Sequence, residues 1–178
     1  MINLLRVDTQ NIPPKLWVTE HHILDNEKNR SDYVGVPECY QKLYLLDLNK
    51  TLAEHCIWDY KNGIYYPEQD IYSNKLANAI MLDDAVTVII TSRGKEYKDQ
   101  TVHNMMLQLP AFKVAGFACK KQKFQKVEVF KKTFAQRLLD MGIDENDIFG
   151  IESNSNTRTA YKSIGIQSKT REGFLNGR

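Results

Sequence analysis

The chain has 178 residues, of which 42% are apolar and 26% charged, and a formal net charge of +2. This composition is typical of one soluble globular domain and excludes an intrinsically disordered chain. The near-neutral charge excludes a strongly basic polyelectrolyte, so any basic surface must be local. No run approaches the roughly 18 apolar residues of a membrane-spanning helix, and the N-terminus does not resemble a signal peptide, so we expect a cytoplasmic protein.

The three cysteines, Cys39, Cys56 and Cys119, are widely spaced and form no CxxC pair. This pattern is typical of free thiols in a reducing compartment rather than of a disulfide framework or a zinc site. The histidine and cysteine residues at 21–22 and 55–56 have no further partners at ligand spacing. We therefore expect no metal site built from histidine and cysteine.

Residues 43–170 alternate between short apolar runs and amphipathic segments, whereas residues 1–42 do not. We predict an N-terminal extension packed on the core over 1–42, one α/β domain over 43–170, and a loose tail over 171–178. The domain is predicted to be a layered sandwich around a central, mostly parallel sheet. In chain order, we expect a strand over 43–47, a hairpin over 57–66, a helix over 74–82, a strand over 85–91, a helix over 95–109, a strand over 112–118, a helix over 127–143, a strand over 147–151 and a helix over 157–164.

Three polar residues, Asp47, Thr91 and Glu152, lie at or just beyond the ends of predicted strands. In parallel sheets, ligands bind outside the carboxyl ends of the strands. We therefore expect these three side chains to face one cleft. The alternative for each is a local role, as a turn residue, a polar strand end or a helix cap.

The segments YLLDLNKT, VIITSR, a lysine-bearing helix and DIFGIESN occur in the order, and at about the spacing, of the four motifs of the haloacid dehalogenase (HAD) superfamily. Residues 43–166 resemble this family, and most closely its minimal-cap branch, which includes polynucleotide phosphatase and RNA-repair-like domains. The resemblance implies a Rossmannoid three-layer fold with a small flap hairpin and no large cap. It also implies a nucleophilic aspartate, Mg²⁺, and hydrolysis of phosphate esters through an aspartyl-phosphate.

The first motif departs from the family pattern DxDxT at its second position. By resemblance, Asp47 is the nucleophile and a magnesium ligand, and Thr51 braces the loop. The second aspartate, which would act as general acid and base, is replaced by Asn49. An amide does not titrate in the useful range, and the lost step is typically worth roughly 10²- to 10⁴-fold in rate. The main-chain carbonyl of Asn49 could still bind magnesium.

The second and third motifs supply candidate phosphate ligands. By resemblance, the Thr91 hydroxyl binds a phosphate oxygen, and Arg93 could add a charged fork. Lys131 is the candidate that neutralises phosphate beside the nucleophile, and the alternatives are Lys132 or a helix lysine that is merely solvated.

The fourth motif keeps one carboxylate, Glu152, where the family often has adjacent acidic residues. Magnesium prefers hard oxygen ligands that include one or two carboxylates. Asp47, Asn49 and Glu152 could just supply them, so we expect Mg²⁺ to be bound weakly or lost. The polar loop could alternatively cap the next helix at Ser155 or Asn156. Departures at both the acid/base position and the metal cradle suggest that the fold is kept while catalysis decays.

Two surface segments suggest a macromolecular partner. Aromatic residues alternate along the hairpin, and lysines surround a phenylalanine in the segment before the helix over 127–143. Rings that stack on bases and lysines that neutralise phosphates are typical of nucleic-acid binding. A hairpin packed on the core and a solvated charged face are the alternatives. The predicted binding residues are Trp58, Tyr60, Lys120, Lys121, Lys123 and Lys126, with Tyr65, Tyr66, Phe124, Lys131 and Lys132 beside them.

We therefore predict a HAD-like protein with a degraded site that binds nucleic acid or a nucleic-acid machine such as RNA polymerase, a role for which phage regulators of host transcription provide one setting. The alternative is a magnesium-dependent phosphohydrolase that acts on nucleotide or polynucleotide ends. In that case Asp47 would be the nucleophile, and Asn49 would stand at the acid/base position.

Overall fold

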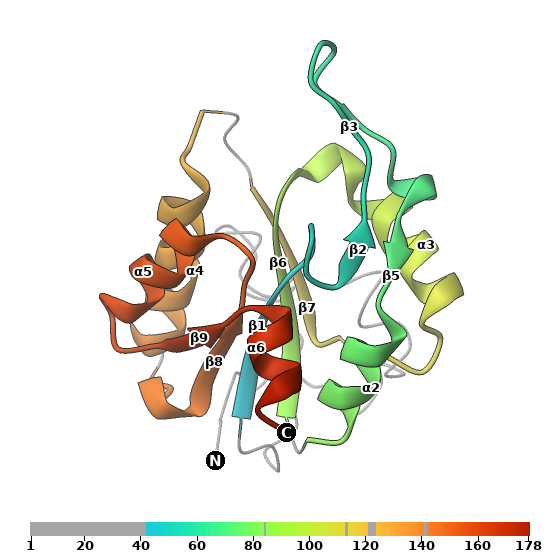
Figure 1. Ribbon diagram of the computed structural model, residues 1–178. Coiled ribbons are helices and arrows are strands. Elements are labelled where there is room, and N and C mark those ends of the chain that lie inside the picture. The colour runs from blue at the N-terminus through green and yellow to red at the C-terminus, as the bar shows by residue number, and fades with distance from the viewer. Residues whose placement is uncertain (1–41, 84, 113, 121–123, 141) are drawn as a thin grey trace, which may run out of the picture.

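A central parallel sheet with helices on both faces forms the core of the fold (Figure 1). The computed structural model describes residues 42–178 except 84, 113, 121–123 and 141. The predicted N-terminal extension over 1–42 lies outside the described residues, apart from Lys42. The α/β class, the central parallel sheet and the Rossmannoid arrangement expected from the sequence are confirmed.

All five strands of the sheet run parallel, in the order β7-β6-β1-β8-β9. The first strand in the sequence is thus in the middle, and the chain winds outward first on one side and then on the other. The direction of winding reverses beside the carboxyl end of β1, which is where doubly wound sheets bind ligands. The strands are β1 (Lys42–Asp47), β6 (Ala85–Gly94), β7 (Gly116–Lys120), β8 (Ile148–Ile151) and β9 (Gln167–Lys169).

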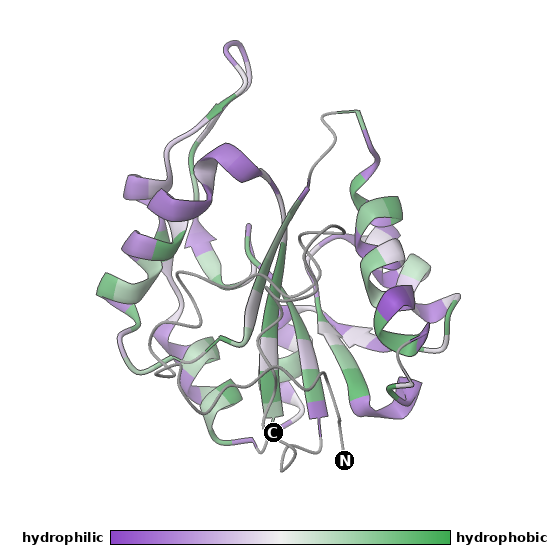
Figure 2. Cartoon of the chain, turned by 180° about the vertical axis from the view of Figure 1, so that it is seen from behind, coloured by the Kyte–Doolittle hydropathy of each residue, from purple (hydrophilic) through white to green (hydrophobic). Residues whose placement is uncertain are grey.

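The apolar run of β1 serves two cores because alternate side chains of a strand point to opposite faces. Leu43 and Leu45 pack in the core beneath α4 and α5, whereas Tyr44 and Leu46 pack beneath α2, α3 and α6. Figure 2 shows hydrophobic residues along the central strands and hydrophilic residues at the tip of the hairpin. Burial of each leucine stabilises the fold by about 2 kcal/mol. The helices are α2 (Asn74–Met81), α3 (Lys98–Gln108), α4 (Val127–Asp140), α5 (Ser155–Lys162) and α6 (Arg171–Asn176), with short 3₁₀ turns η4 (Pro67–Gln69), η5 (Lys95–Tyr97) and η6 (Glu145–Asp147).

Among the described residues, no helix has both the length and the apolar character needed to cross a membrane.

A small flap connects β1 to α2 and includes the predicted hairpin. Its strands pair antiparallel, β2 with β5 and β3 with β4. Gly63 has a φ of 67°, a left-handed conformation that glycine adopts without strain, and this fits the predicted Asn62-Gly63 turn. In Figure 1 the hairpin projects beyond the carboxyl end of the sheet. The flap strands are β2 (Ala53–His55), β3 (Trp58–Asp59), β4 (Ile64–Tyr65) and β5 (Ile71–Tyr72).

Two strands have ends that differ from the sequence prediction. β6 continues past Thr91 to Gly94, because its pairing with β7 shifts in register and resumes at Gly94. β7 begins at Gly116 rather than at Phe112, because the Phe112 N–H donates to the Leu109 carbonyl in the turn that follows α3. Thr91 therefore lies within β6 rather than at its end, whereas β1 ends at Asp47 and β8 ends at Ile151, as predicted.

The loose tail predicted over 171–178 is wrong for most of its length, because α6 forms there. Thr170 caps this helix by accepting a hydrogen bond from the Gly173 N–H at 3.0 Å. Phe174 is buried, with its ring 5.6 Å from the Tyr44 ring and 6.3 Å from the Phe149 ring. A local cap and one buried aromatic anchor therefore order this segment.

Candidate functional site

Three of the predicted site residues lie at the same edge of the sheet. Asp47 ends β1 and is in register with Ile90 of β6, so Thr91 follows one position further along. Glu152 follows Ile151, which is the last residue of β8. Because β1 is parallel to both β6 and β8, the carboxyl ends of the three strands meet. The structure therefore brings these residues together as the sequence predicted.

A buried charge cluster joins the first, third and fourth motifs. The Lys131 ammonium donates to Asp47 Oδ1 at 2.7 Å and to Glu152 Oε2 at 2.6 Å. Lys131 and Glu152 are each 1% exposed, and Asp47 is 5% exposed. Of the two lysines left open by the sequence, Lys131 rather than Lys132 thus faces the site. For the same reason Lys131 does not belong to the basic surface segment.

The second oxygen of Asp47 is held from two directions. Thr51 Oγ1 and Ser153 Oγ each donate to Asp47 Oδ2 at 2.8 Å. Thr51 is fully buried, and its N–H donates to the Leu48 carbonyl at 3.2 Å, which closes the loop after β1. Thr51 therefore braces this loop, as the resemblance implied. Ser153 is an additional partner that the sequence did not predict.

The charges in the cluster shift one another's pKa values. Burial alone would raise the pKa of Asp47, but Lys131 and the hydrogen bonds from Ser153 and Thr51 bring it below its usual value. Burial and the neighbouring Asp47 raise the pKa of Glu152 to about 7, against the attraction of Lys131. Burial would lower the pKa of Lys131, but the two carboxylates raise it. The ammonium thus stays protonated between two unequal carboxyl groups.

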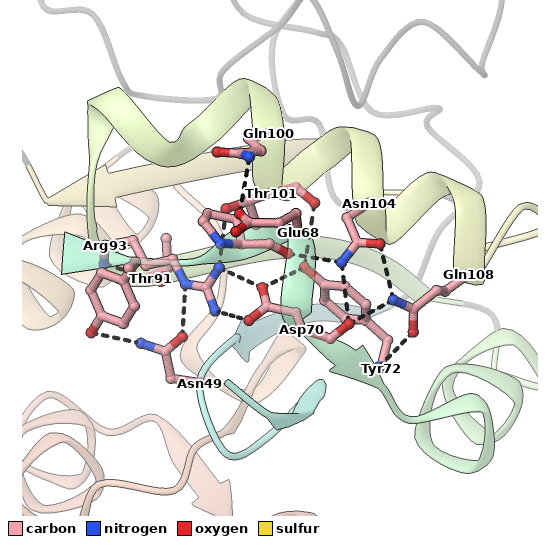
Figure 3. Close-up of polar contacts among 12 residues, drawn as sticks. Asn49, Glu68, Asp70, Tyr72, Thr91, Arg93, Gln100, Thr101, Asn104 and Gln108 are labelled. Atoms are coloured by element: carbon pink, nitrogen blue, oxygen red, sulfur yellow. Dashed lines mark hydrogen bonds and ion pairs between the residues drawn. The ribbon is translucent and has the colours of Figure 1, made fainter. Parts of the chain in front are cut away.

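Asn49, at the acid/base position, is part of a second network (Figure 3). Its Oδ1 accepts from Arg93 Nε at 2.9 Å, and its Nδ2 donates to the Tyr65 hydroxyl at 3.2 Å. Ser92 Oγ lies 3.5 Å from the same Nδ2. The amide is therefore fixed on both sides by the flap and β6.

Arg93 does not provide the charged fork that was predicted for phosphate. Its guanidinium forms a bidentate ion pair with Asp70, at 2.5 and 2.9 Å, and also donates to Thr101 Oγ1 at 3.1 Å. Arg93 is 1% exposed and Asp70 is 2% exposed. The guanidinium carbon lies 5.0 Å from the centre of the Tyr65 ring. With its donors engaged inside the protein, Arg93 instead connects the flap to the sheet.

Thr91 lies inside the protein rather than at an open surface. The residue is fully buried, and its Oγ1 accepts a hydrogen bond from the Arg93 N–H at 3.2 Å. Its predicted contact with a phosphate oxygen stays a prediction.

The loop after β8 is rigidly held. Glu152 Oε1 accepts from the Asn154 N–H at 2.9 Å, and Arg158 Nη1 donates to the carbonyls of Glu152 and Ser153 at 2.9 and 2.8 Å. Asn154 caps α5 by accepting from the N–H groups at 156 and 157. The cap is thus Asn154, and the predicted caps Ser155 and Asn156 are wrong by one or two positions, because helix boundaries shift easily by that amount in sequence predictions.

The predicted magnesium ligands Asp47, Asn49 and Glu152 are engaged by other groups of the protein, and magnesium binding by them stays a prediction. Every oxygen of the two carboxylates already accepts a hydrogen bond within the protein. The Asn49 carbonyl oxygen lies 3.2 Å from Ser153 Oγ, whose one hydrogen is closer to Asp47 Oδ2. In the part of the chain that the structure describes, no group of three or more His, Cys, Asp and Glu is arranged to hold a metal. The ammonium of Lys131 joins the two carboxylates.

The predicted partner-binding residues are only partly described. Tyr60, at the hairpin, is 86% exposed, while Trp58 is half-buried with its ring centre 4.2 Å from that of Tyr65. Lys126 is exposed and Lys120 half-buried. Phe124, Tyr66 and Lys132 are described, with Phe124 94% exposed, whereas Lys121 and Lys123 lie outside the described residues.

Three solved structures are similar to this chain. A protein from Legionella pneumophila assigned to HAD superfamily subfamily III A, a hydrolase, aligns with a TM-score of 0.44 and 15% identity over 69% of this chain and 60% of its own. The 3-deoxy-D-manno-octulosonate 8-phosphate phosphatase from Moraxella catarrhalis, solved with magnesium, phosphate and KDO, aligns with a TM-score of 0.43 and 11% identity over 83% and 66%. A hypothetical protein from Xanthomonas campestris aligns with a TM-score of 0.44 and 10% identity over 94% and 75%.

No family model matches the sequence, and no curated protein matches it significantly. The chain spans 60% and 66% of the lengths of the first two structural neighbours. At identities of 15% or less, what the site can do is decided by its own residues.

Proposed function

We propose that this HAD-like chain does not hydrolyse phosphate esters and instead binds nucleic acid or a nucleic-acid machine such as RNA polymerase. The proposed lack of hydrolysis rests on the chemistry and the contacts of Asn49. Its side chain cannot exchange protons in the useful range, and Arg93 and Tyr65 hold it from both sides. The acid/base position is therefore occupied by a neutral structural group.

Two other titratable groups in the site do not replace the missing acid. Burial raises the pKa of Tyr65, so its phenol stays protonated at neutral pH and is a poor base. Glu152 has a pKa of about 7 but is 1% exposed. Its two oxygens are engaged by Lys131 and by the Asn154 N–H, so a substrate could reach it only after these contacts break.

The surface at the carboxyl end of the sheet supports the binding role. Tyr60 and Phe124 expose most of their rings, and Lys126 is exposed beside Phe124. Figure 1 shows the hairpin and the segment that leads into α4 at the same end of the sheet. Exposed rings together with lysines suit single-stranded or distorted nucleic acid, in which stacking and phosphate neutralisation act on one ligand.

The catalytic part is tested with an aryl phosphate and with 3′- and 5′-phosphorylated oligonucleotides in the presence of magnesium. We expect no turnover above buffer for the wild type or for Asn49→Asp. In that variant the new carboxyl would share the buried Arg93 with Asp70 and would stay in contact with Tyr65, so it would be held in a structural network rather than free to exchange protons with a substrate. Turnover by the wild type that disappears in Asp47→Asn would refute this part of the proposal.

The binding part is tested by fluorescence anisotropy with a single-stranded oligonucleotide over a series of salt concentrations. Reversing Lys120, Lys121 and Lys123 to glutamate should weaken binding and reduce its salt dependence, because each lost phosphate contact removes about one released counterion. Tyr60→Ala should weaken binding without changing the salt slope, since stacking is not ionic. Lys75→Glu, on the exposed face of α2, is the matched control. Equal affinity in all variants would contradict nucleic-acid binding at this surface.

The second candidate is the magnesium-dependent phosphohydrolase with an aspartyl-phosphate intermediate. One observation favours it: Asp47 is oriented by Thr51 and paired with Lys131, the arrangement that the resemblance implies for a nucleophile. The Asp47→Asn comparison separates the two candidates, because only a phosphohydrolase loses turnover in that variant.

A further inference from the structure

A groove lies between α5 and the edge strand β9, and none of the residues that line it belongs to the Asp47 cluster. It has a volume of about 460 Å³ and is lined by Ser155, Arg158, Thr159 and Lys162 of α5 and by residues 165–168. Its lining contains two cationic side chains and no carboxylate. The local charge is thus positive although the whole chain is nearly neutral.

Arg158 is fixed in this groove without being neutralised. Its Nη1 donates to the main-chain carbonyls of Glu152 and Ser153 at 2.9 and 2.8 Å, and both acceptors are uncharged. Across the described part of the chain, no carboxylate forms an ion pair with Arg158 or Lys162. A guanidinium that is held in place and keeps its charge is suited to bind an oxyanion through its remaining N–H groups.

The spacing of the polar residues places them on one face of α5. Positions 155, 158, 159 and 162 are three or four residues apart, so their side chains are neighbours on a helix. The Thr159 hydroxyl is already used, because it donates to the Ser155 carbonyl at 3.0 Å. Ser155 and Ser168 each add a hydroxyl to the lining, from opposite sides of the groove.

The other wall is formed by residues 165–168, which lead into β9. The N–H groups of Gly165 and Ile166 already donate to the carbonyls of Lys162 and Tyr161, each at 3.1 Å. Glu145 approaches Gly165 at the rim but does not line the groove. The charge and polarity of the groove therefore come from its side chains, with two cations and the hydroxyl-bearing Ser155 and Ser168 in its lining.

We propose that this groove binds a phosphate group, with Arg158 and Lys162 as its charged ligands. The phosphate could belong to a free nucleotide or to a nucleic-acid backbone, which share this chemistry. The proposal does not depend on the proposed function. Arg158 touches the loop after β8 only at main-chain carbonyls, and neither it nor Lys162 forms an ion pair with Asp47 or Glu152 in the described part of the chain.

The test titrates inorganic pyrophosphate into the full chain by isothermal calorimetry, with NMR amide shifts to locate the site. We expect saturable binding with shifts over residues 155–168. Arg158→Gln and Lys162→Gln should each raise the Kd about tenfold, the effect of one charge-assisted hydrogen bond. Lys75→Gln, an exposed lysine on α2, should leave the Kd unchanged. Lys162→Gln is the more decisive variant, because Arg158 also supports the loop after β8.

A phosphorylated oligonucleotide distinguishes the two sources of phosphate. The nucleic-acid backbone is the ligand if the oligonucleotide binds more tightly than pyrophosphate, and if its Kd rises both at higher salt and in the Lys162→Gln variant. Pyrophosphate binding that the oligonucleotide does not exceed would identify a free phosphorylated molecule. Absence of shifts over residues 155–168, or a Kd that neither glutamine variant changes, would overturn the proposal.

Discussion

Two polar networks meet at the carboxyl end of β1, and they differ in how their charges are balanced. In one, the single ammonium of Lys131 lies between the carboxylates of Asp47 and Glu152, so negative charge is in excess. The other, shown in Figure 3, pairs one guanidinium with one carboxylate and is neutral. The first network contains residues whose sequence resembles a phosphatase motif, and the second contains Asn49, the position at which the sequence departs from that motif.

The neutral network explains why an amide fits at position 49. Arg93 already has a carboxylate partner in Asp70, and its Nε donates to Asn49 Oδ1. An aspartate at 49 would add a second negative charge around one buried guanidinium, beside the excess charge of the first network. The asparagine and the buried ion pair are therefore complementary, and changing either one alone should disturb the other.

The largest effect is expected from breaking the neutral network. Asp70→Asn leaves the buried Arg93 without its ion pair, and removal of one partner of a buried pair typically costs about 3–5 kcal/mol. Urea denaturation of the full chain measures this loss. Glu54→Gln is the control, because it removes a partly exposed pair with Arg171 and should cost less than about 1 kcal/mol. Equally small losses in both variants would show that charge balance does not account for Asn49.

The two networks also differ in how far the sequence could predict them. Asp47 and Glu152 follow apolar strands, so their meeting at one edge follows from the parallel sheet. Lys131 could be narrowed only to a pair of adjacent lysines, because the two point about 100° apart on a helix and the sequence did not show which one faces the sheet. Ser153 was passed over because its role depends on a contact with Asp47 across 106 positions.

The neutral network could not be predicted from motifs at all. Asp70 lies in the flap, 23 positions before Arg93, in a segment with no motif of its own. The pair forms because the flap folds back over β6. The sequence alone does not show this contact, so it suggested phosphate as the partner of Arg93. The helix α6 was missed for a related reason, since its stability depends on the Thr170 cap and on the burial of Phe174 against residues far away in the sequence.

A smaller effect is expected from the charged network, and it should depend on pH. The pKa of Glu152 is about 7 in the folded chain against an ordinary value of 4.5, so the folded state binds more protons between these values. The free energy of unfolding should therefore fall as pH rises from about 4.5 to about 7, by on the order of 3 kcal/mol from this group. Asp47, whose pKa is lowered, contributes in the opposite sense: its contribution is fully present above its ordinary value of 3.8 and is lost as pH falls from there through the lower pKa of the folded state.

Glu152→Gln isolates this contribution, because glutamine does not titrate but can still accept from Lys131. We expect urea denaturation between pH 4.5 and 7 to show a falling stability in the wild type and a flatter profile in the variant. Glu128→Gln, in the first turn of α4, is the control and should keep the wild-type slope. If the free energy of unfolding of Glu152→Gln falls with pH as steeply as that of the wild type, a group other than Glu152 titrates in this range. The excess negative charge would then not come from Glu152.

The smallest effects come from two tyrosines, one beside each network. The Tyr72 hydroxyl is buried and donates to Asp70 Oδ2 at 3.1 Å, and the Thr101 carbonyl oxygen lies 3.3 Å away as an alternative acceptor for the same hydrogen. The Tyr161 hydroxyl is buried and has no hydrogen-bond partner among the described residues, and burial together with the charges of Glu152 and Asp47 raises its pKa well above the ordinary value. Tyr72→Phe should therefore cost about 1.5–3 kcal/mol, because it removes a hydrogen bond to a charged group.

Tyr161→Phe should instead leave the stability unchanged or raise it by up to about 1 kcal/mol, because it removes a buried polar group that has no partner. Urea denaturation at pH 6 measures both variants on the same scale. A loss for Tyr161→Phe as large as that for Tyr72→Phe would show that the Tyr161 hydroxyl is bonded, most simply through a buried water. The charged network would then extend into the core beneath α5, and the two networks would be equally well satisfied.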